Sequence, residues 1–360
     1  MNNVQYLLAL HSVDGLGPIR LKALIDFYKD PKLAWEAEAK ELKEIGIPQN
    51  VLEKLSEKRR TLDPNTNLEN IQKMGIKWVS VFDETYPEAL KQIYDPPIIL
   101  YYKGDILPQD SFSIAIVGTR KMTGYGKLVT EKFTSHLVKS GFTVVSGLAR
   151  GVDSTAHLTA LEVDGRTLAV LGGGLNHIYP PENIGLVTKI IGGKGAVMSE
   201  YPPDVPSLPG NFPSRNRIIS GLSKAVLVTE ADIDSGSLIT ARVAIEQGKD
   251  VFAIPGPITS ALSSGPTQLI KEGARIVMNP DEILEEMGID QRIINVGQFT
   301  TNNLSEQEKN ILISLQNESR DIDELCRELK LPTSSILATL LKMEIGGLIR
   351  NLGNNTYCRV

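Results

Sequence analysis

Arginine and glycine residues occur together in segments whose spacing suits the binding of phosphate. In four places an apolar run typical of a strand is followed at once by glycine and then by a helical pattern, so backbone N–H groups would face an anion. Arg120 and Arg150 add forked guanidinium donors to two of these segments. For any one segment, the alternative is a tight turn that holds no ligand. The predicted phosphate-contacting residues are Gly118, Thr119 and Arg120, then Ser146, Gly147 and Arg150, then Gly173 and Gly174, and finally Ser235, Gly236 and Ser237.

A second cluster combines an aromatic ring with two arginines at a predicted helix start, in Phe212-Pro213-Ser214-Arg215-Asn216-Arg217. The dipole at a helix N-terminus favours anions, so arginine side chains there are better explained by a bound anion than by the helix itself. Phe212 could stack on a nucleobase, as aromatic rings do in proteins that bind single strands. The alternative is an arginine held in an interior ion pair with Glu200 or Glu230. We expect Arg120, Arg215 and Arg217 to form one continuous anion-binding track with Asn216 beside it.

Residues for catalysis or metal binding are sparse. The four histidines have no cysteine or HExxH spacing around them, so a zinc site is not expected. Glu230, Asp232 and Asp234 could hold magnesium, although such a run is more often a solvated loop. Leu128 follows Gly126-Lys127, so the hydroxyl of a Walker loop is missing. We therefore expect no catalytic residue, no metal and no cofactor.

Alternating strand and helix patterns indicate where these segments lie in the fold. Strands that are apolar on both faces belong to a buried parallel sheet covered by helices, so the fold class is α/β with a doubly wound, Rossmann-like sheet. The loops that follow parallel strands emerge at one edge, which would bring the glycine segments together. Runs at 78–81 and 98–102 could extend the same sheet. The predicted strands are 114–117, 143–145, 168–171, 196–198, 225–228 and 251–254.

Two smaller units flank the sheet. Residues 1–66 have helical spacing and a weak repeat, in which the glycine turns at 13–18 and 44–48 would each join two helices, as in a helix-hairpin-helix. Residues 67–290 form the sheet domain. Residues 300–360 have the order of a winged helix: helices at about 305–316, 321–329 and 332–343, then a hairpin around 353–355. Lys342 is the only basic residue of the third helix, so this unit is not expected to read duplex DNA.

Composition narrows the class of protein. The 360 residues carry a net charge of −5, yet the 11 basic and 7 acidic residues of segment 111–220 give that segment +4, a local field that could attract a polyanion. Two cysteines exclude a disulfide scaffold. There is no signal-peptide pattern and no apolar run near the ~18 residues that a membrane span needs. A cytoplasmic protein is expected, with no membrane partner.

Seven motifs in order resemble the bacterial DNA-processing protein A family (DprA, also called Smf). The resemblance implies an extended Rossmann domain, a front domain similar to a sterile alpha motif or helix-hairpin-helix, and a DprA-type winged helix. It also implies a homodimer that binds single-stranded DNA, protects incoming DNA and loads RecA recombinase during natural transformation, without catalysis. By motif, Arg120, Arg215 and Arg217 match the phosphate and base contacts. The motifs are Gly118-Thr119-Arg120, Ser146 to Asp153, Gly172 to Leu175 with Tyr179-Pro180, Ser199 to Pro202, Phe212 to Gly221, Ser235 to Ser237 with Thr240-Ala241, and Phe252 to Gly256.

The sequence departs from the family at one position and leaves alternatives open. Some relatives carry a basic residue after Tyr179-Pro180, where this chain has Pro181-Glu182, which predicts a weaker DNA contact there. A nucleotide hydrolase of the lysine-decarboxylase-like group is the competing function, but Thr240 stands where its catalytic glutamate would be. A protein-binding scaffold is a third possibility, against which the basic segment counts. A dimer patch could lie between Ile254 and Leu269, with Ala261 and Leu262.

Overall fold

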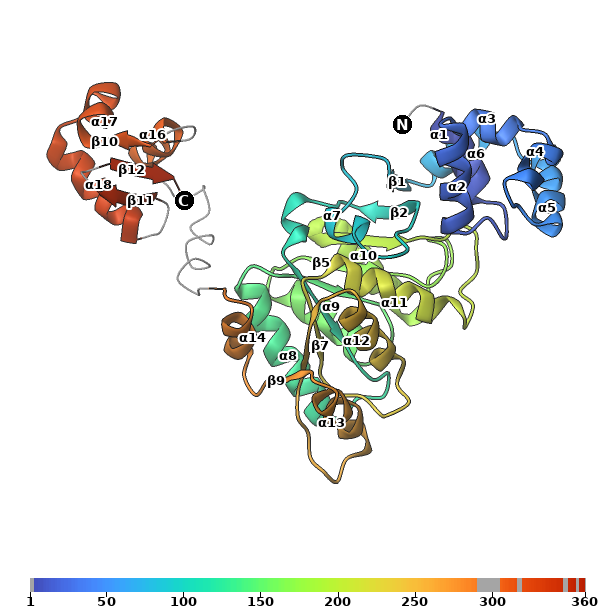
Figure 1. Ribbon diagram of the computed structural model, residues 1–360. Coiled ribbons are helices and arrows are strands. Elements are labelled where there is room, and N and C mark those ends of the chain that lie inside the picture. Colours follow the sequence, from blue (N-terminus) through green and yellow to red (C-terminus); the bar gives the residue numbers. More distant parts are fainter. Residues whose placement is uncertain (1–2, 290–304, 316–318, 346–348, 354–355, 360) are drawn as a thin grey trace. The chain divides into compact units, whose positions relative to one another are not determined.

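The computed structural model describes residues 3–289, 305–315, 319–345, 349–353 and 356–359 (Figure 1). The chain divides into two compact units, Met1–Met278 and Asn279–Val360. The predicted boundary between residues 290 and 300 and the predicted hairpin turn at 354–355 lie outside the described residues. No helix in the described ranges is long and apolar enough to cross a bilayer.

The described residues of the first unit include a nine-stranded sheet. The seven strands from β6 to β9 are parallel, whereas β1 and β2 extend the sheet in antiparallel pairing at one edge. The α/β, Rossmann-like fold class predicted from the apolar runs is therefore confirmed. From edge to edge the strands are β1 (Lys77–Ser80), β2 (Ile99–Gly104), β6 (Gly195–Ser199), β5 (Thr167–Val170), β4 (Thr143–Ser146), β3 (Ser113–Val117), β7 (Ala225–Val228), β8 (Asp250–Ala253) and β9 (Arg275–Ile276).

The strand order reverses at β3, which defines where a ligand can enter. The chain moves outward from β3 to β6 through three helices, then crosses back through α11 to β7 on the other side of β3. Because such crossovers are right-handed, the helices before and after the reversal cover opposite faces. The crevice between the ends of β3 and β7 is the usual ligand position in such sheets. The helices are α8 (Gly124–Lys139), α9 (Val152–Glu162), α10 (Ile184–Lys189), α11 (Asn211–Leu222), α12 (Gly236–Glu246) and α13 (Ser264–Lys271).

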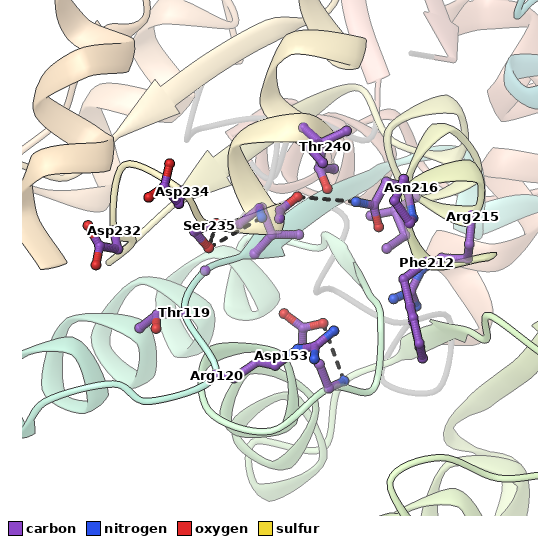
Figure 2. A pocket seen from close by; sticks show the side chains of 18 of the residues that line it. Thr119, Arg120, Asp153, Phe212, Arg215, Asn216, Asp232, Asp234, Ser235 and Thr240 are labelled. Atoms are coloured by element: carbon purple, nitrogen blue, oxygen red, sulfur yellow. Dashed lines mark hydrogen bonds between the residues drawn. The ribbon is translucent and has the colours of Figure 1, made fainter. Parts of the chain in front are cut away.

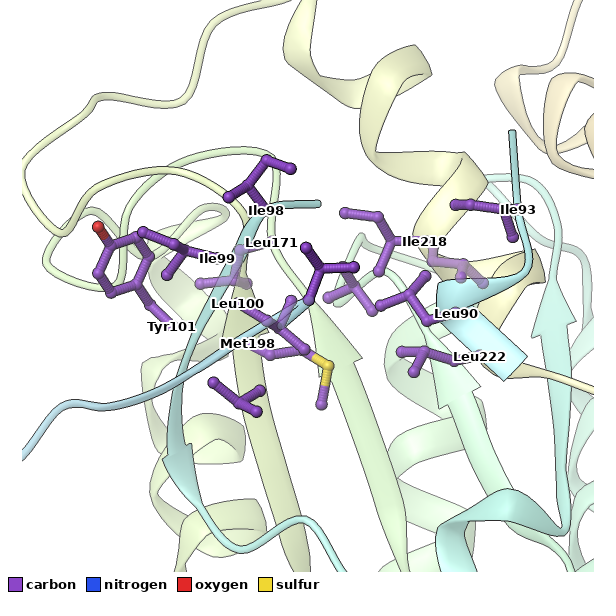
Figure 3. Packing of buried hydrophobic residues seen from close by; sticks show 14 of the residues in the cluster. Leu90, Ile93, Ile98, Ile99, Leu100, Tyr101, Leu171, Met198, Ile218 and Leu222 are labelled. Atoms are coloured by element: carbon purple, nitrogen blue, oxygen red, sulfur yellow. The ribbon is translucent and has the colours of Figure 1, made fainter. Parts of the chain in front are cut away.

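Apolar packing fixes the crossover helix α11 on the sheet. Its Ile218 and Leu222 are buried, and Figure 3 shows them in the cluster that also contains Leu90 of α7 (Glu88–Lys91) and Met198 of β6. At Gly221, a Cβ atom would stand 3.0 Å from Leu90 Cδ1, so α7 packs closely against this helix. Each fully buried aliphatic side chain contributes roughly 1.5–3 kcal/mol. The site elements carried by α11 are thus held by the core.

Six helices precede the sheet and share its core. Gly15 and Gly46 have left-handed φ angles of 91° and 92°, and each lies in a turn between two helices, as the weak repeat predicts. α6 runs across the predicted boundary at residue 66. Buried side chains of these helices form one continuous cluster with those of the sheet, and His11 Nδ1 lies 3.2 Å from Tyr101 Oη of β2. The helices are α1 (Val4–His11), α2 (Pro18–Tyr28), α3 (Pro31–Glu36), α4 (Ala39–Glu44), α5 (Gln49–Thr61) and α6 (Pro64–Lys73).

The second unit has the predicted winged-helix order and its own apolar core, which includes Leu325, Leu340 and Tyr357. Ser305 and Glu308 form the expected capping box at the start of α16. α18 leaves Leu337 and Leu341 exposed. The elements are α14 (Pro280–Glu286), α16 (Glu306–Ser314), β10 (Arg320–Asp321), α17 (Ile322–Leu329), α18 (Thr333–Ile345), β11 (Ile349–Gly353) and β12 (Thr356–Arg359), with the strands paired in the order β10-β12-β11.

A buried histidine couples the fold to pH. His157 of α9 is fully buried, and its Nδ1 lies 2.6 Å from Thr167 Oγ1. The Thr167 hydroxyl donates its proton to Val144 O, so the neutral imidazole must donate from Nδ1. Its Nε2 has no partner among the described residues. Burial, and secondarily the charge of Arg215, lowers the pKa of His157 to about 3.

We predict that His157 makes the protein less stable in mild acid. The unfolded chain binds a proton at His157 below its ordinary pKa of 6.5, whereas the folded protein does not until about pH 3. The free energy of unfolding therefore falls by about 2 kcal/mol between pH 7 and pH 5 through this group alone. Urea denaturation at the two pH values checks this. The His157→Leu variant should lose that part of the difference, and an unchanged difference would contradict the assignment.

Candidate functional site

A cavity of about 740 Å³ lies at the carboxyl edge of the sheet, where the strand order reverses (Figure 2). The loops after β3 and β7, the start of α11 and the start of α12 form its walls. The glycine segments were expected to converge at this edge. Of the predicted site residues, those that line the cavity are Gly118, Thr119, Arg120, Phe212, Arg215, Asn216, Ser235, Gly236 and Ser237.

Arg120 is exposed and lines this cavity, and the exposed Lys121 lies next to it in the sequence. The guanidinium carbon of Arg120 lies 5.4 Å from the centroid of the Phe212 ring, a cation–π arrangement. Tyr179 lies against the same ring, with centroids 5.8 Å apart and planes inclined by 53°. No carboxylate in the described part of the chain forms an ion pair with Arg120. The guanidinium is thus available to an anion, and exposed aromatic surface lies beside it.

The N-terminus of α12 forms another wall. Ser235 caps this helix by accepting a hydrogen bond from Ser237 N at 3.4 Å, and the Asn216 side chain donates to Gly236 O at 3.2 Å. A Cβ atom at Gly236 would meet nothing within 4 Å, so the space around this residue is open. The first turn of a helix carries partial positive charge, which adds to the field of Arg120.

Arg215 lies at the floor of the cavity and is almost fully buried. Its Nη1 donates to Gly147 O at 2.7 Å and to Val170 O, so it ties the ends of β4 and β5 to α11. Gly147 is required here because a Cβ atom would stand 2.5 Å from Arg215 Nη1. Burial lowers the pKa of Arg215 to about 10, which leaves it charged at neutral pH. Asp153 accepts hydrogen bonds from the backbone N–H groups of Gly147 and Ala149 at 3.1 and 3.3 Å, and burial raises the pKa of its carboxyl group.

Arg217 points elsewhere, which corrects the expected track. Two of its nitrogens donate to both carboxylate oxygens of Glu200 at 2.8 and 2.6 Å, and its Nε donates to Asp95 Oδ2 at 2.8 Å. Arg217 does not line the cavity, so the track through Arg120, Arg215 and Arg217 is interrupted. The alternative considered for this cluster, an arginine held in an interior ion pair with Glu200, is the arrangement that Arg217 has. A direct contact between Arg217 and DNA stays a prediction without geometric support.

The other predicted residues also lie outside the cavity lining. Ser146 is fully buried and donates to Ile116 O at 2.7 Å. A Cβ atom at Gly173 would stand 2.5 Å from Ser207 Oγ, and one at Gly174 would stand 2.2 Å from the carbonyl oxygen of Pro203. These two glycines make room for the chain itself. Arg150 is exposed and forms an ion pair with Glu182.

Several lining residues were not among the predicted contacts: Lys121, Asp153, Tyr179, Asp232, Asp234 and Thr240. Each lies within a few residues of a predicted one, so proximity to the glycine segments was the available signal. Asp232 and Asp234 add negative charge to the lining that also contains Arg120 and Lys121. In the described ranges, no group of three or more histidine, cysteine, aspartate or glutamate side chains is arranged to hold a metal ion.

Two family models match the sequence. Residues 77–288 match the family described as DNA recombination-mediator protein A, and residues 298–355 match the DprA winged helix domain. The chain is 37% identical to Protein Smf of Synechocystis across 98% of both chains. It is 42% identical to DNA processing protein DprA of Bacillus subtilis, over 60% of this chain and 73% of that protein.

Solved structures agree with these matches. The X-ray structure of DNA processing protein A from Streptococcus pneumoniae superposes with a TM-score of 0.69 at 36% identity, over 79% of this chain and 99% of that one. DNA processing protein A from Helicobacter pylori, whose structure was described for its single-stranded DNA binding mode, superposes with a TM-score of 0.53 at 33% identity, over 59% and 95% of the two chains.

We predict that Arg217→Ala destabilises the fold. The side chains of Arg217 and Glu200 are only 11% and 10% exposed, so removing the arginine leaves a buried carboxylate without its cation. The free energy of unfolding should fall by about 3–5 kcal/mol, measured by urea denaturation. The double variant Arg217→Met with Glu200→Leu removes both charges and should recover most of this loss. Wild-type stability of Arg217→Ala would contradict a structural role for the pair.

Proposed function

The chain belongs to the DNA recombination-mediator protein A family, and from this membership we propose that it binds single-stranded DNA in the cavity at the carboxyl edge of its sheet. The observation that carries the proposal is the exposed guanidinium of Arg120 lying over Phe212 without a carboxylate partner among the described residues. The binding mode described for the Helicobacter pylori relative supports the choice of ligand.

The cavity offers separate surfaces to the two parts of a nucleotide. Arg120 and the open first turn of α12 suit a phosphate, since both present positive charge and N–H donors. Tyr179, 42% exposed beside Phe212, offers an aromatic face to a base. Stacking of that kind needs an unpaired base, whereas duplex bases already stack on one another. The single strand is therefore the better ligand.

Two carboxylates in the cavity lining restrict the path of a bound DNA strand. Asp232 and Asp234 repel phosphate, so we expect the backbone of a strand to lie along Arg120 and Lys121 rather than along these carboxylates. Bases directed toward the carboxylates could donate hydrogen bonds from their amino groups. A cavity of mixed charge in a chain of net charge −5 also limits non-specific attraction to duplex DNA.

We extend the proposal to a partner and a role. A recombination mediator prepares single strands for a recombinase, so we infer that this protein protects incoming DNA and loads RecA recombinase on it in the cytoplasm during natural transformation. What supports this part is the family resemblance and the family match over residues 77–288. We propose a binding protein rather than an enzyme, with neither a metal nor a cofactor.

We also propose a homodimer, at the edge of the sheet that β9 forms. Leu269 of the expected patch is fully buried within its own chain, which rules that residue out as a contact. Beyond it, Ile276 of β9 is 53% exposed, and β9 pairs with β8 along one side only among the described residues. Exposed apolar groups on an edge strand favour pairing with another chain.

We predict that Arg120→Ala weakens binding of a short single-stranded oligonucleotide by about ten-fold or more, the usual scale of a charge-assisted contact. The plot of log affinity against log salt should flatten by about 0.7, the share of one phosphate on a single strand. Fluorescence anisotropy at several salt concentrations measures both. Arg120→Lys should recover part of the loss, because lysine keeps the charge without the fork. The control Arg242→Ala removes an exposed arginine outside the cavity. A folded Arg120→Ala protein with wild-type affinity and slope would refute the proposed site.

For the dimer, we predict that Ile276→Arg converts the protein to a monomer. Two guanidinium groups brought together across a two-fold axis would repel each other and remove apolar area. Light scattering at tens of micromolar, roughly where modest interfaces are populated, gives the mass. Ile184→Arg is the control, since Ile184 is similarly exposed on α10 at the other half of the sheet. A wild-type monomer would exclude the homodimer.

A further inference from the structure

An ion pair at the rim of the site joins two loops of the carboxyl edge. Arg150 follows β4, and Glu182 lies in the short helical turn Pro181–Asn183 that follows β5. The two side chains are 53% and 49% exposed. Asn183 donates from its side chain to Leu148 O at 2.8 Å, which holds the Glu182 turn against the Arg150 loop. The ion pair between Arg150 and Glu182 therefore lies where the two loops contact each other.

Both partners adjoin the cavity. Ala149 and Asp153, on either side of Arg150, line it, and so does Tyr179, three residues before Glu182. The Arg150 loop also packs directly on the loop that carries Arg120, because a Cβ atom at Gly151 would stand 2.3 Å from Thr119 O. A strand that leaves Arg120 toward β4 would meet Arg150 next.

The ion pair is easily exchanged. Exposed ion pairs contribute little to stability, because water screens them and the side chains lose rotamer freedom. A phosphate diester offers the guanidinium the same two-oxygen geometry as a carboxylate. Glu182 is ionised at neutral pH, and its hydrogen bond with Arg150 holds its pKa below the usual range, so it competes with phosphate as an anion.

We propose that Glu182 is an internal competitor for a phosphate-binding arginine: its carboxylate occupies Arg150 in the DNA-free protein, and a backbone phosphate of single-stranded DNA displaces it on binding. The inference rests on the proposed function and deepens it, since it adds a second phosphate contact beside Arg120 and a residue that limits its strength. Glu182 acts only through Arg150. It sets how much affinity that contact contributes and touches no DNA itself.

A double-mutant cycle tests this mechanism. Wild type, Glu182→Gln, Arg150→Gln and the double variant are titrated with one single-stranded oligonucleotide at several salt concentrations. Glu182→Gln should bind about two- to five-fold more tightly, the range of an exposed ion pair. Arg150→Gln should bind more weakly, with a salt slope lower by about 0.7. In the Arg150→Gln background, Glu182→Gln should have no further effect.

The competing explanation is general repulsion of DNA by a nearby negative charge. In that case Glu182→Gln would tighten binding equally in both backgrounds, which would overturn the inference. Asp164→Asn is the matched control, because Asp164 is an exposed ion-pair partner at the far end of α9, away from the carboxyl edge. It removes the same charge and should leave the affinity unchanged. Thermal melting verifies that all variants fold.

The cycle separates this inference from the proposed function. If wild type binds single strands and binding depends on Arg120, but the Arg150 and Glu182 variants show no coupling, only the internal competitor is refuted. If wild type does not bind single strands at all, the proposed function and the inference both fail.

Discussion

A charged guanidinium held out of water, that of Arg215, is the interaction on which the carboxyl edge of the sheet depends. Burying such a charge is costly unless it is hydrogen-bonded; Arg215 Nη1 donates to Gly147 O and Val170 O, whereas its buried Nε has no partner among the described residues. In return it fixes the ends of two strands to the crossover helix α11. Phe212, which lies beside Arg120, and Asn216, which donates to Gly236 O of α12, are carried on the same helix, so their positions follow from this anchor. The ion pair of Arg217 with Glu200 then secures the opposite side of the helix.

The fold followed from the sequence to a large extent, whereas the question of which arginine faces the cavity and which forms an interior ion pair did not. Apolar runs followed by glycine gave the strands and the edge at which their loops meet, because that relation is local. The direction of a side chain on a helix depends on its phase: Arg215 and Arg217, two residues apart, lie about 200° apart around the axis and could not both face one cavity. Asp95, which binds Arg217, lies 122 residues away in sequence, and nothing local indicates that contact.

The presence of glycine in the sequence could not distinguish a ligand site from close packing of the chain, and the reason is physical. A missing Cβ atom permits close approach by a ligand or by the chain itself, and the sequence looks the same in both cases. At Gly147, Gly173 and Gly174 the protein itself fills the space, while at Gly236 the space is open. The proposed anion-binding edge is therefore narrower than four glycine segments suggested, and it is centred on Arg120, Phe212 and the start of α12. The conclusion about the family does not change with this correction.

The apolar core that runs unbroken from the six N-terminal helices into the sheet limits how the chain can be divided. A modular protein can exchange its domains because each part buries its own apolar surface. Here α6 spans the place where a cut would otherwise fall, and His11 reaches across to Tyr101 of the sheet. A fragment that began after residue 66 would lose part of α6 and expose to water the faces that the helices now cover. A gene that lost these helices would have to gain polar residues on the faces of the sheet that they now cover, whereas the winged-helix unit has a core of its own.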